Sequence, residues 1–268
     1  MTQFACPSLR RTLLLSSLVL LAGTAKVSAQ ADSLDDHKLT EIYTPVPPIV
    51  TPGKTFSDAP SDAVILFDGK NLDEWVKVSD GAPADWIVSN NLLTVNKKAG
   101  NIQTKRNFTN YQLHLEYRIP ENITGEDQAR GNSGIFLASI GKGDAGYELQ
   151  ILDNYNNKTY TNGQVGSVYK QSVPLANPCR KPGEWQTYDI AWVAPTFNPD
   201  GTLKSPARVT AFLNGVLVQD NFILQGQTRY RGKPYYQPHG PSPIKLQAHG
   251  DKSEPISFRN IWVRPTPY

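Results

Sequence analysis

Tyr147–Asp153 read YELQILD, and the first five residues of this stretch alternate between apolar and polar side chains. In an extended strand, such alternation places Glu148 and Gln150 on one face and the apolar side chains on the other. The apolar face suits a buried core, while the polar face presents a carboxylate beside an amide. We therefore predict a β-strand here, with the beginning of a pocket on its polar face.

A second segment, residues 131–137 (GNSGIFL), starts as a polar turn and continues as an apolar strand. Gly, Asn and Ser are typical turn residues, and the run that follows them has the composition of a strand. Asn132 and Ser133 are therefore expected beside the acidic strand, where they would supply hydrogen-bonding side chains to the same pocket.

Strand patterns dominate the rest of the chain, and none of these segments shows a sustained helical period. Further expected strands cover residues 63–67, 86–88, 92–95, 111–119 and 186–193. Residues 208–218 are expected to form a β-hairpin, because Asn214-Gly215 suits the positive backbone angles of a tight turn. Many short strands joined by Gly, Pro and Asn turns predict an all-β fold, a two-sheet antiparallel jelly-roll sandwich.

The N-terminus has the pattern of a signal peptide. Two arginines precede an apolar run over residues 13–22, and residues 27–29 (VSA) fit a signal-peptidase site. An apolar run of about ten residues is too short to span a bilayer, which needs roughly 20. We therefore expect residues 1–29 to be cleaved after Ala29, no membrane span, and export of the mature protein to the periplasm or the medium.

Removal of the signal peptide makes the protein formally neutral. Residues 1–29 hold three basic residues and no acidic ones, so 24 of the 27 basic residues remain against 24 acidic ones. The mature protein therefore lacks the net positive charge that would favour binding to nucleic acid or to an anionic membrane. Cys179 is then the one cysteine left, and we interpret it as an incidental thiol, because no paired His accompanies it.

The rest of the chain divides into an arm and one domain. Residues 30–61 contain five prolines among largely polar residues, which favours an extended linker or arm. Residues 62–268 have the size of a single all-β domain. No cofactor is predicted and no loop has a recognisable metal-ligand spacing, although Asp and Asn loop oxygens leave a divalent ion such as Ca²⁺ open as an alternative. The oligomeric state is also left open.

Two further strands carry polar residues at every second position. Such a face is either the solvent side of an antiparallel sheet or part of the pocket. His249 is a candidate for the pocket, because it ends its strand just before Gly250-Asp251, where loops commonly build sites. An imidazole suits general acid or base catalysis near neutral pH. The polar residues are His114, Glu116 and Arg118 on one strand, and Lys245, Gln247 and His249 on the other.

Tyrosines gather in loop-like segments rich in Gly and Asn, where flat amphipathic rings suit the wall of a pocket for a sugar-like ligand. The alternative for each of them is ordinary loop packing. The five tryptophans lie within or beside strand-like runs, and we expect them in the core. The loop tyrosines are Tyr155, Tyr160, Tyr169, Tyr230, Tyr235 and Tyr236.

Several short motifs occur in an order that is specific, although each is weak alone. Over nearly all of residues 62–268, they make the chain resemble the 3-keto-disaccharide hydrolase family of the concanavalin-A-like lectin/glucanase superfamily. The motifs are LFDGKNL at 66–72 with Trp75, NSGI at 132–135, YELQILD at 147–153, GEWQ at 183–186, YDI at 188–190, LNG at 213–215, LQ at 246–247 with His249-Gly250, and FRNI at 258–261.

The resemblance implies a jelly roll whose concave face holds a carbohydrate, and an activity on glycosides already oxidised to a ketone at sugar carbon 3. Such a ketone acidifies the C2 proton, so its removal can expel the glycosidic oxygen from C1, after which water adds back. Our hypothesis makes Glu148 the base and His249 the acid. The residues expected to bind the oxidised sugar or stabilise its enolate are Asn132, Ser133, Gln150, Gln247 and Arg118, with Glu116, Asp153, Tyr169 and Lys245 also in the pocket.

Two other functions stay open at this point. A retaining glycosidase of the same superfamily has the pattern Glu-x-Asp-x-x-Glu, and its two carboxylates lie about 5 Å apart. Here Glu148, Gln150 and Asp153 take these positions, which puts an amide in the centre and a shorter acid at the end. A non-catalytic carbohydrate-binding module would need only the tyrosine loops and the amides, since the fold does not decide the function.

Overall fold

The computed structural model of the protein describes residues 37–267. The chain divides into two compact units, Met1–Ile49 and Val50–Tyr268. The described part of the first unit is a short 3₁₀ helix, η1 (His37–Thr40), followed by an irregular segment. The predicted signal peptide and the start of the predicted arm lie outside the described residues. None of the helices in residues 37–267 has the length and apolar character that a membrane crossing requires.

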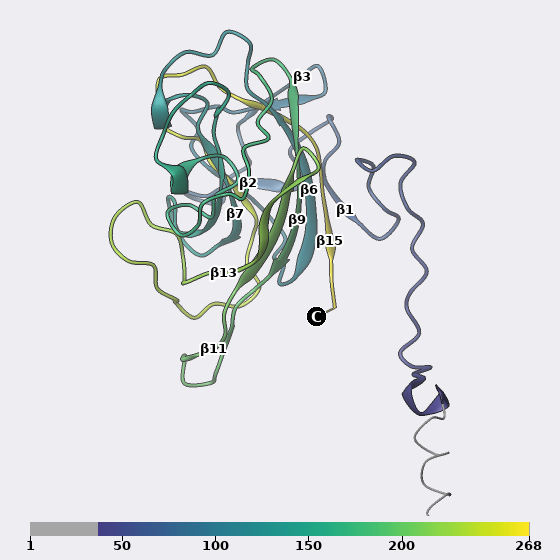
Figure 1. Cartoon of the computed structure of the whole chain (residues 1–268). Coiled ribbons are helices and arrows are strands. Elements are labelled where there is room, and N and C mark those ends of the chain that lie inside the picture. Colours follow the sequence, from purple (N-terminus) through teal and green to yellow (C-terminus); the bar gives the residue numbers. More distant parts are fainter. Residues whose placement is uncertain (1–36, 268) are drawn as a thin grey trace, which may run out of the picture. The chain divides into compact units, whose positions relative to one another are not determined.

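The second unit contains an antiparallel sheet of eight strands (Figure 1). Its strand order is β13-β12-β9-β6-β15-β4-β3, and β1 also pairs with β15. Along β9, buried residues alternate with more exposed ones, so that one face of the sheet turns to the core. The strands are β1 (Val64–Phe67), β3 (Ile87–Ser89), β4 (Leu92–Thr94), β6 (Tyr111–Arg118), β9 (Trp185–Val193), β12 (Arg208–Leu213), β13 (Val216–Ile223) and β15 (Ser257–Pro265).

A second antiparallel sheet has five strands in the order β2-β5-β14-β7-β8. Its edge strand β8 contains the alternating residues that open the YELQILD stretch. The strands are β2 (Trp75–Lys77), β5 (Ile102–Thr104), β7 (Ser133–Ser139), β8 (Gly146–Ile151) and β14 (Lys245–Leu246). A separate two-stranded ladder, β10 (Thr196–Phe197) and β11 (Leu203–Ser205), and two 3₁₀ helices, η2 (Asp127–Ala129) and η3 (Thr161–Gly163), complete the described elements.

The inner faces of the two sheets meet in one core. Tyr111 of β6 donates a hydrogen bond to the carbonyl of Leu137 in β7 at 2.6 Å, and Tyr188 of β9 donates one to the carbonyl of Gln150 in β8 at 2.8 Å. These phenols reach from the large sheet to the small one through buried apolar side chains. The predicted all-β, two-sheet antiparallel sandwich is therefore confirmed.

The predicted hairpin is also confirmed. Asn214 and Gly215 have φ values of 52° and 78° and join β12 to β13. Both residue types tolerate positive φ, which the tight turn requires at its two central positions.

The tryptophan prediction holds for four residues and is wrong for Trp185. Trp75, Trp86, Trp192 and Trp262 are buried. Trp185 is only half-buried, because the alternation along β9 turns it to the outer face of the large sheet. Arg118 and Arg259 lie over its ring there, with Cζ at 4.9 and 4.0 Å from the ring centroid.

Candidate active site

A cavity of about 120 Å³ opens on the outer face of the five-stranded sheet. Glu148 reaches it from β8, and Gln247 and His249 follow β14 on the other side of β7. The cavity thus brings together six residues that were named from the sequence: Asn132, Glu148, Tyr169, Tyr230, Gln247 and His249. It is lined by Asn132, Asp144, Glu148, Tyr169, Thr228, Arg229, Tyr230, Gln247 and His249.

Glu148 is buried at the wall of this cavity, with 6% of its surface exposed. Its carboxyl group lies against Gly134 of the neighbouring strand β7. A methyl group at Gly134 would overlap with Glu148 Oε1, so the glycine leaves the space that the carboxyl group occupies. Burial, aided by the charge of Asp144 and opposed by that of Lys245, raises the pKa of Glu148 to about 8. At neutral pH the carboxyl group therefore keeps its proton and is a proton donor.

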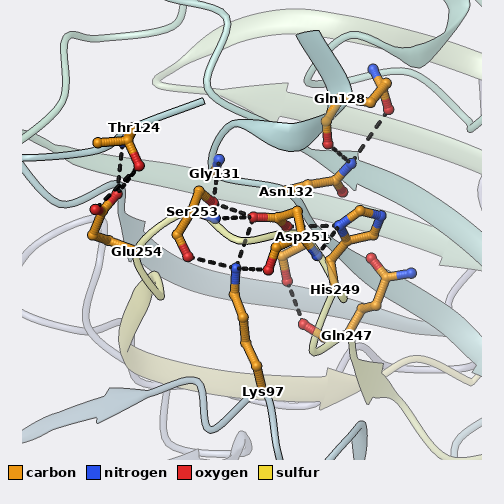
Figure 2. Close-up of polar contacts among 11 residues, drawn as sticks. Lys97, Thr124, Gln128, Gly131, Asn132, Gln247, His249, Asp251, Ser253 and Glu254 are labelled. Carbon is orange, nitrogen blue, oxygen red and sulfur yellow. Dashed lines mark hydrogen bonds and ion pairs between the residues drawn. The ribbon is translucent and has the colours of Figure 1, made fainter. Parts of the chain in front are cut away.

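His249 forms a pair with Asp251 beside the cavity (Figure 2). His249 Nδ1 lies 2.7 Å from Asp251 Oδ2, and Asp251 Oδ1 accepts a hydrogen bond from Lys97 Nζ at 2.8 Å. Ser253 donates to Asp251 Oδ1 through both its backbone N–H, at 2.8 Å, and its hydroxyl. Asp251 is thereby fixed in one orientation.

The charge state of this pair follows from the same contacts. Burial favours protonation of Asp251, but hydrogen bonds from His249, Lys97 and Ser253 outweigh it and hold the pKa of Asp251 well below its ordinary value. The ionised carboxylate accepts the Nδ1 proton of His249, which leaves Nε2 with its lone pair when the imidazole is neutral. His249 is therefore suited to remove a proton.

A chain of amides joins the cavity wall to η2. Gln128 Oε1 accepts a hydrogen bond from Gln150 Nε2 at 3.1 Å, and the Gln128 carbonyl accepts one from Asn132 Nδ2 at 2.8 Å. Within the described part of the chain, Gln150 Oε1 and Gln247 Oε1 are buried without a hydrogen-bond donor. Buried amide oxygens normally accept hydrogen bonds. Gln247 lines the cavity and Gln150 does not, so the Gln247 oxygen is the one suited to bind a hydroxyl group of a ligand.

Two predicted pocket residues support the site from behind its wall. Ser133 is fully buried and donates from Oγ to the Gln247 carbonyl at 2.8 Å. Lys245 is also fully buried, and its ammonium donates to the carbonyls of Gly143 and Ala145, each at 2.8 Å. Lys245 therefore holds the loop that carries Asp144, and direct binding of substrate by Lys245 or Ser133 is corrected to this supporting role.

Asp153, another predicted pocket residue, is fully buried and does not line the cavity. Its Oδ2 lies 2.8 Å from Nε of Arg130, and its Oδ1 accepts a hydrogen bond from the backbone N–H of Tyr155. Asp153 follows the end of β8, and these two contacts hold its carboxylate away from the cavity. Its predicted contact with substrate is corrected on this ground.

Glu116 and Arg118 are not brought to the cavity. They lie on the outer face of the large sheet, which is the opposite side of the sandwich. Arg118 lies over Trp185, while Glu116 binds Nε of Arg259 at 2.6 Å and Nδ2 of Asn260 at 3.0 Å. The alternating polar residues of β6 therefore form the outer face of the large sheet. The prediction that Glu116 and Arg118 lie in the substrate pocket is wrong.

Several residues of the site were missed from the sequence. Asp251 follows His249 at a spacing of two, a signal that the sequence already contained. Gln128 lies in η2, whereas Asp144, Thr228 and Arg229 lie in loops, and no local pattern distinguishes these four residues. Of the loop tyrosines, Tyr169 and Tyr230 line the cavity, and Tyr160 binds the hydroxyl of Tyr169 at 2.8 Å. Within residues 37–267, no three His, Cys, Asp or Glu side chains gather as a metal-binding group.

The fold and this site together define a class, that of the β-sandwich carbohydrate-active proteins of glycosyl hydrolase type. A solved structure of a candidate glycosyl hydrolase from Parabacteroides distasonis ATCC 8503 is 52% identical in sequence, with a TM-score of 0.80. The match covers 86% of this chain and 96% of that chain. No curated protein matches the chain.

Two more candidate glycosyl hydrolases from the same organism share the fold, at 21% and 23% identity with TM-scores of 0.55 and 0.54. Each match covers 76% of this chain, and 94% and 99% of the respective relatives. Residues 62–264 match the 3-keto-alpha-glucoside-1,2-lyase-like domain, and the chain belongs to this family. The family resemblance seen in the sequence motifs is thereby confirmed.

Proposed function

We propose that the protein cleaves 3-keto-glycosides by elimination, with His249 as the base and Glu148 as the acid. One observation carries this proposal: a carboxyl group protonated by burial and an imidazole oriented by a carboxylate line the same cavity. The roles are the reverse of those in the sequence-based hypothesis. Burial supplies Glu148 with a proton to give, and Asp251 leaves Nε2 of His249 free to accept one.

These two groups carry out the proton transfers of the elimination. His249 Nε2 takes the proton from C2, which the neighbouring ketone acidifies, and negative charge passes to the ketone oxygen. The C1–O bond then breaks with formation of a C1–C2 double bond, while Glu148 gives its proton to the departing oxygen. The products are an alcohol and an unsaturated 3-keto sugar. Later addition of water to the double bond returns a 3-keto sugar, so that the sum is hydrolysis.

The polar wall of the cavity supports this assignment. The unpartnered oxygen of Gln247 is an acceptor for a sugar hydroxyl group, and the amide N–H of Gln247 is a donor for the charge that develops on the ketone oxygen. An amide at position 150 also keeps a second negative charge away from Glu148 on its own strand.

A retaining glycosidase is less well supported, because it needs two carboxyl groups that act on one bond. Asp153, the second acid of the strand pattern, is paired with Arg130 outside the cavity. Asp144 does line the cavity, but it is exposed on a loop and bound to Asn101 Nδ2 at 2.9 Å. A non-catalytic sugar-binding module would not require the ordered pair of His249 and Asp251.

The test compares one glucoside in its 3-keto and unoxidised forms, each incubated with the purified protein with and without a chelator. We expect release of the alcohol from the 3-keto form alone, with an unsaturated product visible by mass spectrometry. Release from the unoxidised form would favour a retaining glycosidase instead. Sugar binding without release from either form would favour a binding module, and both results would overturn the proposal.

We also propose that the enzyme acts outside the cytoplasm, on the strength of the signal-peptide pattern in residues 1–29. N-terminal sequencing of protein recovered from the periplasm or medium is expected to begin at Gln30. An N-terminus at Met1, with the protein confined to the cytoplasm, would contradict export.

A further inference from the structure

The mouth of the cavity carries a group of cations without acidic partners, here called the basic rim. It consists of Arg229, Arg231, Lys233 and Lys170, and the first three lie exposed within five consecutive residues. Arg229 and the exposed Tyr230 line the cavity. Across residues 37–267, no carboxylate forms an ion pair with any of the four, whereas Lys97, Arg130 and Arg259 each pair with one.

Three of the four rim cations, Lys170, Arg229 and Arg231, contact aromatic rings or carbonyl groups. Lys170 Nζ lies 4.4 Å from the ring centroid of Tyr230 and donates to the Tyr230 carbonyl at 2.8 Å. Arg231 approaches the same ring, with Cζ at 5.4 Å from the centroid. Arg229 Cζ lies 5.0 Å from the ring of Tyr235, and its Nε donates to the Arg231 carbonyl at 3.2 Å. These contacts order the cations but leave their charge uncompensated.

Two acidic groups lie near the basic rim, but neither neutralises its positive charge. Asp144 is on the cavity wall, where it already accepts a hydrogen bond from Asn101. Glu148 lies deep in the cavity and is protonated at neutral pH, because burial raises its pKa to about 8. Positive charge therefore dominates on the solvent side of the cavity.

The geometry of the proposed elimination indicates which part of a substrate lies near the basic rim. The 3-keto ring must place C1 and C2 between the buried Glu148 and His249. The cavity, at about 120 Å³, is smaller than the roughly 300–1,000 Å³ of sites that enclose a drug-sized ligand. It therefore encloses only part of a disaccharide, and the leaving part must extend toward the exposed Tyr230 and its neighbouring cations.

We propose that the basic rim binds a carboxylate on the leaving part of the substrate, so that the preferred substrates are 3-keto-glycosides of acidic sugars such as uronic acids. This inference rests on the proposed function for the position of the reacting ring. A carboxylate is the favoured anion because two arginines present planar forks of donors that match its geometry. Lys170 and Lys233 also attract the carboxylate, and an ammonium group does not require one particular orientation of it.

The test uses two 3-keto-disaccharides with the same linkage, one ending in glucuronic acid and the other in its neutral C6 amide. We expect the wild-type kcat/KM for the acid to exceed that for the amide by about tenfold, since exposed charge pairs each contribute up to about fivefold. Added salt should reduce this preference, because salt screens exposed charges. The double variant Arg229→Gln/Arg231→Gln removes both guanidinium forks and should bring the ratio to within about twofold of one.

Lys204→Gln is the matched control, because Lys204 is an exposed cation of β11 that does not line the cavity. It should keep the wild-type preference. A wild-type ratio of one or less, or an unchanged ratio in the double variant, would overturn the inference while leaving the proposed elimination intact.

A binding measurement separates failure of this inference from failure of the proposed function. If no 3-keto-glycoside is cleaved, titration calorimetry with glucuronic acid and its amide still tests the rim. Tighter binding of the acid, lost in the double variant, supports the rim alone. Equal binding of both compounds overturns it.

Discussion

His249 Nδ1 lies 2.7 Å from Oδ2 of Asp251, whose other oxygen is bound by Lys97 and Ser253. This relationship fixes the plane of the imidazole and the position of its proton. Because Asp251 is ionised, the Nε2 atom of His249 is left to act as a base at the cavity. The arrangement makes the chemistry of the site depend on a residue that does not line the cavity.

Asp251→Asn is therefore expected to lower kcat by about 10²–10⁴ with little change in KM. An amide in place of the carboxylate can donate to Nδ1, which would move the imidazole proton to Nε2 and remove the base. Steady-state kinetics on a 3-keto-glucoside measures the effect. Circular dichroism of the variant should match wild type, and a change of less than threefold in kcat would argue against His249 as the base.

Activity should fall as pH rises through about 8, because Glu148 then loses the proton that it gives to the leaving oxygen. A kcat profile between pH 6 and pH 10 checks this. Substrates with a good leaving group, such as a 3-keto nitrophenyl glucoside, need less help from an acid and should show a weaker decline. The same steep decline for both substrates would assign it to another group.

Glu148 should also make the fold less stable at high pH. Between the ordinary glutamate pKa and about 8, the folded protein keeps a proton that the unfolded chain releases, so stability falls as pH rises across this window and then levels off. Glu148→Gln removes this loss, and we expect the variant to be more stable than wild type by about 1–3 kcal/mol at pH 9 and nearly equal at pH 4.

Urea denaturation at the two pH values measures this difference. The exposed residue Glu121 offers the matched control, and Glu121→Gln should track wild type at both values. Parallel pH dependence in Glu148→Gln and wild type would mean that Glu148 titrates normally in the folded protein.

Gly134→Ala is expected to reduce kcat by at least about 10², since the removed acid contributes that much in typical cases. The added methyl group would overlap with Glu148 Oε1, which is the far end of a flexible side chain, so the carboxyl group moves while the strand persists. The melting temperature should therefore change little. Gly240→Ala, where the added methyl group meets no atom within 4 Å, is the control. Full activity of Gly134→Ala would show that the position of Glu148 is not critical.

Arg118→Gln should leave kcat/KM within about twofold of wild type, as surface changes away from a site usually do. Arg118 lies over Trp185 on the opposite side of the sandwich from the cavity. The same assay applied to Gln128→Ala should show a loss of about tenfold, because the side-chain oxygen of Gln128 accepts hydrogen bonds from Gln150 Nε2 and Asn132 Nδ2. A larger loss for Arg118→Gln than for Gln128→Ala would mean that the active site lies on the outer face of the eight-stranded sheet instead.

Much of the fold could be predicted from local patterns. Alternation within each strand and the Asn214-Gly215 turn depend on neighbouring residues, so the strand positions and the hairpin followed directly. The same patterns misassigned Trp185, Glu116 and Arg118. Period two says that two sets of side chains point in opposite directions, but it does not say which set faces the core or on which sheet a polar face lies.

The sequence by itself determined the class of fold, the family, and the two groups at the centre of the site, Glu148 and His249. The roles that we propose for them rest on the tertiary structure alone. The pKa of a carboxyl group depends on how much water reaches it, and the proton position of an imidazole depends on its partner across a turn. Burial over β7 keeps Glu148 protonated. Asp251 orients His249 and is itself held by Lys97, which is distant along the chain. These are properties of packing between segments far apart along the chain, which no local pattern records.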